Sequence, residues 1–326
     1  MKKLFAVVLA LAGLAAGWLT WVATANVRLP TVPYEFTVHP GSGLKTVGRQ
    51  LSADGVLPEG ESFWILGRLL GKAQRIQAGT YRLDKPMSAL EIIDKLARGD
   101  VVFVEALFVE GTTLKQWLAQ LASNTRVKQT VGGKSETDLR TALGLEHSPE
   151  GWLFPDTYRF APGTADIEIL KRAHAAMKKR LADAWSTRDA TIPLKSSYEA
   201  LILASIVEKE TGQASERPLI ASVFMNRLKR SMRLQTDPTV IYGMGDRFDG
   251  NIRKRDLSAD TPWNTYTREG LPPTPIAMPG MASLRAATHP TESDYLYFVA
   301  RGDGSHEFSR TLEEHNRAVA KYQLGK

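Results

Sequence analysis

The first segment of the chain is apolar throughout. After Lys2 and Lys3, no charged residue occurs in residues 4–27. A helix of this length can cross a bilayer, which takes about 20 apolar residues. Because the positive residues precede the span, we expect the N-terminus to stay in the cytoplasm and the rest of the chain to lie outside it. Trp18 and Trp21 are expected at the far membrane interface, where amphipathic rings collect.

A cleaved signal peptide is the alternative for the same segment. Ala23-Thr24-Ala25 has the small-x-small form of a cleavage site. However, the apolar stretch is longer than that of a usual signal peptide, which has about 7–15 residues, and this favours a retained anchor over residues 1–27. Both interpretations place the remainder of the chain outside the cytoplasm.

Shorter alternations of apolar and polar positions follow a linker at residues 28–33, which contains two prolines. They predict a small β-α-α-β unit and one further helix within residues 34–100. Ser88 is a suitable N-cap for that last helix. The expected elements are a strand at 34–38, helices at 44–54 and 61–70, a strand at 78–83 and a helix at 88–98.

Residues 101–326 carry longer amphipathic patterns and predict a larger domain with mixed secondary structure. The expected helices lie at 112–121, 167–185 and 197–211, with a final helix at 312–322. Residues 217–234 are expected to continue as helix and then turn. Residues 101–109 are rich in strand-forming residues, and 296–300 form a short expected strand. From residue 235 onward the chain is rich in Pro, Gly, Asn and Thr, so we expect mostly ordered loops and short strands there. The predicted fold class is therefore α+β, with an N-terminal transmembrane helix.

Composition and motif spacing exclude several classes of function. The absence of cysteine excludes a disulfide framework, a thiolate zinc site and a cysteine nucleophile. The net charge of +7 is mild, and the Lys/Arg clusters fall on a helical pattern, so no nucleic-acid surface is expected. The six histidines lack the His-Glu-x-x-His spacing of zinc hydrolases, and no nucleotide-binding loop is present. We therefore expect neither a metal nor a cofactor.

A carboxylate near the end of the 197–211 helix is the first candidate for chemistry. Glu210 shares a helix face with Ile206 and Val207. A carboxyl on an apolar face tends to stay protonated, as a general acid for glycosidic cleavage must. Glu208 lies on a different face, where it could pair with a Lys or Arg. The alternative is a helix that simply ends in solvated charges, and the residues alone favour that alternative.

A second group of candidates lies in the C-terminal region. Gln235, Asp237, Asn264 and Tyr266 mix amide, carboxylate and aromatic groups. A glycan cleft needs this mixture, because sugars present both hydroxyls and apolar ring faces. Ordinary turn chemistry explains the same residues equally well, since Asp-Pro and Asn-Thr are common in turns.

Taken together, these segments resemble the endolytic murein transglycosylases of the MltG/YceG-like type. The resemblance runs from the anchor nearly to the end of the chain, and its many long matches occur in a fixed order. Residues 36–44 also resemble the opening of a LysM domain. The matching segments are residues 150–158, 204–211, 214–217, 221–224, 233–243, 264–266, 270–273 and 295–300.

The resemblance implies a catalytic residue. In this family the second glutamate of the Glu-Lys-Glu run is catalytic, which corresponds to Glu210 here. The Glu210-Thr211 pair is also similar to the Glu-Ser pair of other lytic transglycosylases, so Glu208 and Thr211 are supporting candidates. Gln235, Asp237, Asn264 and Tyr266 are then expected to position the glycan.

The resemblance also implies the architecture and the reaction. It implies a LysM-like subdomain over residues 34–100 and a catalytic domain over residues 101–326. The expected reaction is cleavage of the MurNAc–GlcNAc bond of nascent glycan strands to give 1,6-anhydroMurNAc ends, which would terminate strand growth. The substrate is peptidoglycan, and peptidoglycan synthases are further candidate partners.

The expected location is the inner (plasma) membrane, with a single span, a cytoplasmic N-terminus and a periplasmic or otherwise extracytoplasmic catalytic domain. Two alternative functions remain open from the sequence. One is a glycan hydrolase with Glu210 as acid and Asp237 as base, and the other is a non-catalytic peptidoglycan-binding scaffold.

Overall fold

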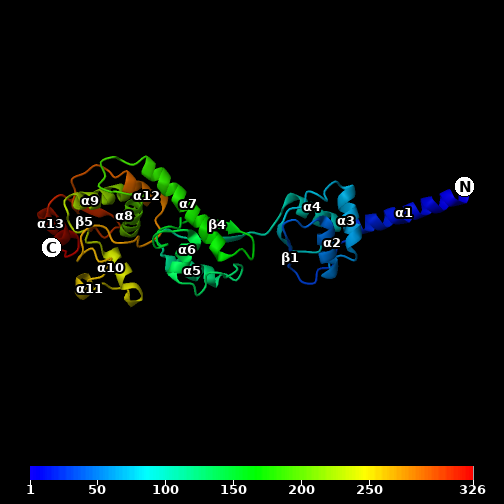
Figure 1. The fold of residues 1–326 in the computed structure, drawn as a ribbon, viewed down its shortest axis with the longest axis horizontal. Helices are drawn as coiled ribbons and strands as arrows, with labels where there is room; N and C mark the ends of the chain where they lie inside the picture. Colours follow the sequence, from blue (N-terminus) through cyan, green and yellow to red (C-terminus); the bar gives the residue numbers. More distant parts are fainter. Residues whose placement is uncertain (326) are drawn as a thin grey trace. The chain divides into compact units, whose positions relative to one another are not determined.

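The computed structural model describes residues 1–325, apart from the side chain of Lys2. The chain forms two compact units (Figure 1). The smaller unit comprises Met1–Glu105 with Arg159–Gly163, and the larger comprises Ala106–Tyr158 with Thr164–Lys326.

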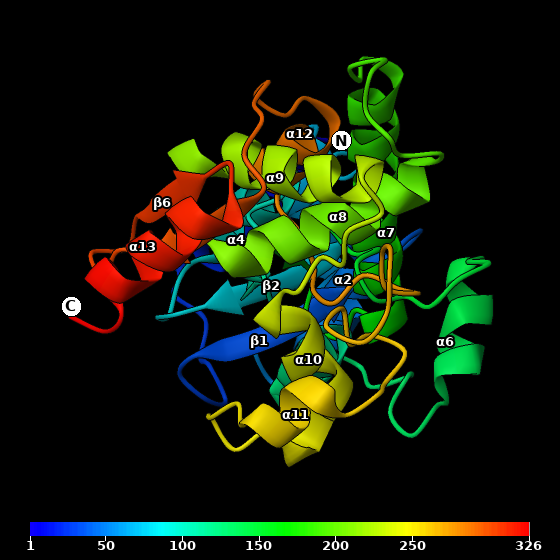
Figure 2. The same cartoon turned by 90° about the vertical axis from the view of Figure 1, so that its left-hand side faces the viewer.

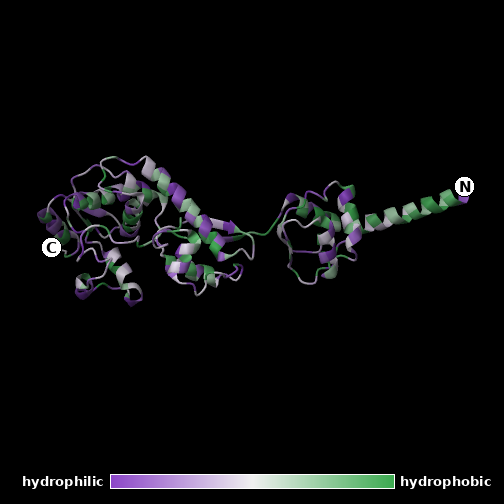
Figure 3. Ribbon diagram, in the orientation of Figure 1, coloured by the Kyte–Doolittle hydropathy of each residue, from purple (hydrophilic) through white to green (hydrophobic). Residues whose placement is uncertain are grey.

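The chain begins with a single apolar helix, α1 (Lys2–Thr24). Its segment Lys3–Thr24 is long and apolar enough to cross a membrane, and it is hydrophobic along its whole length (Figure 3). The last turns of α1 pack on the rest of the smaller unit, where Val22 and Ala23 are buried. The helix is therefore a candidate membrane anchor, as the sequence predicted.

The rest of the smaller unit contains the predicted β-α-α-β order. Strand β1 pairs antiparallel with β2, with Tyr34 opposite Leu83. Ser88 caps α4 in a capping box with Glu91, which confirms the predicted start of this helix. The elements are β1 (Tyr34–Val38), α2 (Leu44–Ala53), α3 (Gly60–Leu69), β2 (Gly79–Leu83) and α4 (Ala89–Arg98).

Two glycines let α2 and α3 approach closely. A Cβ atom on Gly48 would lie 2.6 Å from the carbonyl oxygen of Gly60, and a Cβ on Gly60 would lie 2.7 Å from the Gly48 backbone. Any side chain at either position would separate the two backbones. The alternating side chains of β1 and the inward faces of α2, α3 and α4 then close a core around Phe63 and Tyr81, both fully buried.

The larger unit is mainly helical and carries short strands. Strand β5 pairs antiparallel with β6, with Phe298 opposite Phe308, and α13 packs on this hairpin. Strands β3 and β4 form another two-stranded sheet, and the division between the two units passes through both strands, after Glu105 and after Tyr158. The elements are β3 (Val104–Leu107), α5 (Leu114–Ser123), α6 (Glu136–Leu143), β4 (Thr157–Phe160), α7 (Asp166–Ser186), α8 (Ser197–Glu210), α9 (Arg217–Lys229), α10 (Asp237–Met244), α11 (Lys254–Ser258), α12 (Met281–Thr288), β5 (Tyr297–Ala300), β6 (His306–Ser309) and α13 (Leu312–Tyr322).

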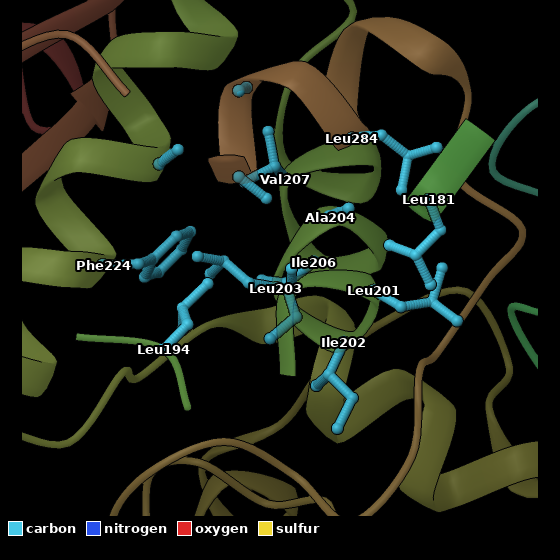
Figure 4. Close-up of a cluster of buried hydrophobic side chains, with 14 of the residues drawn as sticks. Leu181, Leu194, Leu201, Ile202, Leu203, Ala204, Ile206, Val207, Phe224 and Leu284 are labelled. Atoms are coloured by element: carbon cyan, nitrogen blue, oxygen red, sulfur yellow. The ribbon is translucent and has the colours of Figure 1, made fainter. Parts of the chain in front are cut away.

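Helix α8 forms the centre of the larger unit's core. Residues 200–207 are all buried, because this part of the helix is apolar on every side. Leu181 of α7, Phe224 of α9 and Leu284 of α12 belong to the same buried cluster (Figure 4). In Figure 2, α8 and α9 run side by side next to α12, and the three helices contact one another.

The prediction of an α+β fold with an apolar N-terminal helix is confirmed, but the expectation for the C-terminal region was partly wrong. Helices α10, α11 and α12 lie where loops and short strands were expected, and α6, β4 and β6 were not predicted at their positions. Helix α10 begins Asp237-Pro238, and proline in the first turn favours a helix start as well as a turn. Most residues of helix α12 are small and show no clear amphipathic pattern, and its burial against α8 and α9 stabilises it.

Candidate active site

Glu210 is the last residue of α8, at the point where this buried helix leaves the core. The next residue, Thr211, has an extended backbone with φ −141° and ψ 136°, so the helix ends there. Because the preceding turns are packed on all sides, the position of Glu210 is fixed by the core.

The Glu210 side chain borders a cavity of about 420 Å³. The cavity lies within the larger unit and combines segments that are distant in sequence: the ends of α8 and α9, residues 234–237, Tyr266, the β5–β6 hairpin and α13. Its polar and aromatic lining residues are Glu210, Arg227, Gln235, Asp237, Tyr266, Tyr297, Phe298, His306, His315 and Gln323. Three of the four residues that were expected to position a glycan therefore lie in the same cavity wall as Glu210.

The surroundings of Glu210 favour its neutral form near neutral pH. Burial raises the pKa of this carboxyl to about 7, and the negative charge of Asp237 acts in the same direction. The hydrogen bond from Thr236 Oγ1 opposes that rise, as do the charges of His306 and Arg227. The C-terminal end of a helix also disfavours an anion. Such a carboxyl can both donate and accept a proton near neutral pH.

A buried network of threonines holds the segment next to Glu210. The Thr236 amide donates to Thr265 Oγ1 at 3.1 Å, and the Thr265 and Thr239 hydroxyls are 2.9 Å apart. Gln235 has a φ of 50°, and its backbone N–H donates a hydrogen bond to the Thr265 carbonyl at 3.2 Å. A left-handed backbone at a residue other than glycine costs free energy and is common at functional sites. The network therefore holds the Gln235 backbone in this conformation at the cavity wall.

Tyr266 and Asp237 are coupled within the cavity. Tyr266 Oη donates to Asp237 Oδ1 at 2.6 Å. Burial and the hydrogen bond to Asp237 raise the pKa of Tyr266, so the phenol stays protonated. One oxygen of Asp237 is therefore occupied, while its carboxylate still faces the cavity.

Asn264 lies behind the cavity wall rather than in it. The residue is fully buried, and its Nδ2 donates to the carbonyls of Leu257 and Ala259 at 3.0 and 2.7 Å. Its Oδ1 accepts a hydrogen bond from the Tyr266 amide at 2.8 Å. The amide group thus holds the backbone on both sides and supports Tyr266, and Asn264 does not line the cavity.

Glu208 and Thr211 are also not among the residues that line the cavity. Glu208 has a side chain that is only 4% exposed, and it pairs with Arg217 at 3.1 Å. It also accepts the Gly280 amide at 2.9 Å, so the expected ion pair is present. Thr211 is buried and accepts the Gln213 amide at 2.9 Å. Both residues stabilise the end of α8 and its neighbours.

Several cavity residues were not singled out from the sequence. Arg227 is buried and donates to the carbonyls of Leu296 and Leu234 at 2.6 and 2.8 Å, which ties α9 to two walls of the cavity. His306 Nδ1 lies 2.7 Å from a carboxylate oxygen of Glu216. No local pattern identifies these residues, because their partners are distant in sequence.

Thr236, in contrast, lies between Gln235 and Asp237, which were both predicted from the sequence. Its hydroxyl at this position could have identified it as a further site residue. Within residues 1–325, no three His, Asp or Glu side chains converge in a way that could hold a metal ion.

Comparison with known proteins gives a consistent set of relatives. A model of the YceG-like family matches residues 36–321. The chain is 34% identical over 317 residues to an endolytic murein transglycosylase of Bacillus subtilis (strain 168), covering 92% of this chain and 85% of that protein. It is 30% identical to an endolytic murein transglycosylase of Streptococcus pneumoniae serotype 2 (strain D39 / NCTC 7466), covering 86% of this chain and 57% of that protein.

A solved structure is also similar. The crystal structure of a yceG-like protein from Listeria monocytogenes is 30% identical and superposes with a TM-score of 0.56. The match covers 87% of this chain and 98% of that one.

Proposed function

Because the chain belongs to the YceG-like family, we propose that it is a peptidoglycan lytic transglycosylase that cuts glycan strands internally, with Glu210 as its single catalytic acid and base. The observation that carries this proposal is the position of Glu210. Its carboxyl lies at the end of a rigid buried helix, borders a cavity and has a pKa of about 7.

In the first step, protonated Glu210 donates its proton to the glycosidic oxygen between N-acetylmuramic acid and N-acetylglucosamine. The bond from that oxygen to muramic C1 breaks, and positive charge develops at C1 and the ring oxygen. The N-acetylglucosamine-linked part of the strand leaves as an alcohol. The ionised Glu210 is then stabilised by the Thr236 hydroxyl and by the positive charge of Arg227.

In the second step, the C6 hydroxyl of the same muramic residue attacks C1, and Glu210 accepts its proton. The product is a 1,6-anhydro ring, Glu210 is again protonated, and no water is consumed. One carboxyl is therefore sufficient, whereas glycoside hydrolases generally need two. A pKa close to neutral suits a group that must act as acid and then as base.

The other cavity residues would position the glycan. Gln235 offers an amide, the Tyr266–Asp237 pair offers a ring face and a carboxylate, and Thr236 orients the catalytic carboxyl. Asn264 acts indirectly by holding the Tyr266 backbone.

A hydrolase that uses Asp237 as base is the second candidate, because Asp237 faces the same cavity as Glu210. One of its oxygens is occupied by Tyr266, which leaves less capacity to hold and deprotonate a water molecule.

The remaining expectations concern the location of the enzyme. Helix α1 would cross the inner membrane once with its N-terminus in the cytoplasm, which leaves the enzyme on the outer side, near newly made strands. Cleavage there would terminate strand growth, with peptidoglycan synthases as candidate partners. The β-α-α-β order of the smaller unit supports a LysM-like role in holding glycan.

The test is digestion of uncrosslinked glycan strands by the full-length protein in detergent, followed by mass spectrometry. We expect wild type and a surface control, Glu313→Gln, to release internal fragments with anhydro ends, and Glu210→Gln to release none. Glu313 is exposed on α13 and lies outside the cavity. Undiminished cleavage by Glu210→Gln would refute the assignment of Glu210. If none of the three proteins cleaved the strands, the protein would be a wall-binding scaffold.

A further inference from the structure

The part of α1 that is free of protein contacts is too short to cross a membrane. Residues 4–17 are all exposed, whereas Trp18 Nε1 donates to Ser62 Oγ at 3.2 Å and Val22 and Ala23 are buried. At about 1.5 Å per residue, residues 4–17 extend about 21 Å, but the hydrocarbon core is about 30 Å thick. If α1 spans the bilayer, its packed turns must also lie within it.

The protein that packs on those turns must then reach the bilayer. The Trp18 hydrogen bond places the first turns of α3 against α1, and α3 lies next to the end of α1 in Figure 1. Leu69 lies two helical turns after Ser62 and therefore on the same side of α3. Ile65 lies between them on the neighbouring stripe. The side of α3 that faces the departing anchor is thus apolar.

Within residues 1–325, no protein group covers either of these two side chains fully. Leu69 is 71% exposed and Ile65 is 39% exposed, although Phe63 and Leu66 of the same helix are buried in the core. An apolar side chain in this position is stabilised when lipid replaces water around it.

The polar groups of α3 suit the interfacial region of a membrane. Trp64 is partly buried, and the charged ends of Lys45 and Arg68 lie 5.1 and 5.3 Å from its ring centre. Tryptophan, lysine and arginine are the residues that collect at headgroup depth. The acidic Glu61 is neutralised by Lys45 at 3.1 Å.

We propose that the smaller unit lies on the outer membrane–water interface, with the Ile65 and Leu69 side of α3 inserted among the lipids. The inference rests on the proposed role of α1 as a retained anchor and goes beyond it. The smaller unit would then contact the lipid surface, and α1 and α3 together would fix its position relative to that surface.

The absence of cysteine allows a direct test in the full-length protein. Single cysteines at Leu69, Leu11 and Thr37 would carry nitroxide labels, with the protein reconstituted in lipid nanodiscs. Leu11 reports on the anchor itself. Thr37 is an exposed position on β1, which lies on the side of the smaller unit away from α1 (Figure 1). All three native side chains are exposed, so the labels should leave the fold intact.

The readout is the collision rate of each label with oxygen, which is concentrated in lipid, and with a water-soluble nickel chelate. We expect the labels at positions 69 and 11 to favour oxygen and the label at position 37 to favour the chelate. If the label at position 69 favours the chelate, like the label at position 37, while the label at position 11 favours oxygen, α1 spans the membrane but the insertion of α3 is refuted. If the label at position 11 also favours the chelate, both the membrane span of α1 and the insertion of α3 are refuted.

Discussion

The hydroxyl of Thr236 donates a hydrogen bond to the carboxyl of Glu210, which borders the candidate active site. Thr236 is itself buried and fixed by Thr265. The carboxyl therefore has one neutral donor that stabilises its anion, in surroundings that otherwise favour its protonated form. This balance leads to a prediction about the pH dependence of cleavage.

Thr236→Val should shift the pH profile of kcat/KM. The hydrogen bond lowers the pKa of Glu210, so its loss should raise that pKa above its value of about 7. The alkaline limb, where the acid loses its proton, should move to higher pH. We expect kcat to fall about tenfold, since a hydrogen bond to a charged group contributes about 1.5–3 kcal/mol.

The measurement is the rate of strand cleavage across mildly acidic to mildly alkaline pH. Thr267→Val is the matched control, because the Thr267 hydroxyl bonds to Asp260 and not to the cavity. An alkaline limb that stays in place, or moves to lower pH, would contradict the role given to Thr236.

Tyr266→Phe should weaken glycan binding more than it slows the chemistry. The substitution removes the 2.6 Å hydrogen bond to Asp237 but keeps the ring in the cavity wall. With its partner lost, Asp237 is no longer held in place, and we expect KM to rise about fivefold while kcat changes little, which corresponds to about 1 kcal/mol. Steady-state kinetics on defined strands measure both values.

Tyr322→Phe serves as the control, because that hydroxyl bonds to Glu307 outside the cavity. A loss of kcat in Tyr266→Phe with unchanged KM would instead assign this phenol to the chemical step.

Glu150 should make the stability of the fold depend on pH. Burial raises the pKa of this carboxyl from 4.5 to about 7, although it accepts the Leu114 amide and the Tyr242 hydroxyl. Between these two values the folded protein keeps a proton that the unfolded chain has lost. This bound proton stabilises the folded state. Its contribution to the free energy of unfolding is therefore fully present below pH 4.5, falls as pH rises towards 7, and is absent above pH 7.

The size of this contribution is about 3 kcal/mol, from the difference between the two pKa values. Glu150→Gln should flatten the slope of unfolding free energy against pH in this window. Urea titrations at several pH values measure it, with Glu292→Gln as the exposed control. An equally steep slope in Glu150→Gln would show that another group causes the dependence.

The sequence predicted the elements whose apolar pattern is local. The face of α8 that carries Glu210 and the N-cap at Ser88 follow from residues a few positions apart. Helical spacing also placed Glu208 on a different face from Glu210. The structure shows the ion pair expected of Glu208, with Arg217 as its partner. The helix face depends on the 3.6-residue period, and the helix start depends on the residue type that precedes it.

The rest of the site depends on contacts that are distant in sequence. Arg227 and His306 reach the cavity because α9 and the β5–β6 hairpin converge there. Asn264 has the residue type of a sugar ligand, but its amide is used by backbone groups that only the folded loop brings within reach. Residue type alone does not distinguish a side chain that faces a cavity from one that supports its wall.

The central claim is that Glu210 donates a proton to the glycosidic oxygen and then accepts a proton from the C6 hydroxyl, and that no water is consumed. The most direct measurement is cleavage of glycan strands by the full-length protein in heavy-oxygen water, with mass spectrometry of the new ends. The account predicts anhydromuramic ends that carry no label, because the ring closes on the substrate's own C6 oxygen. Reducing ends that carry the heavy oxygen at C1 would contradict it and would show a hydrolase, with water activated by a second carboxylate such as Asp237.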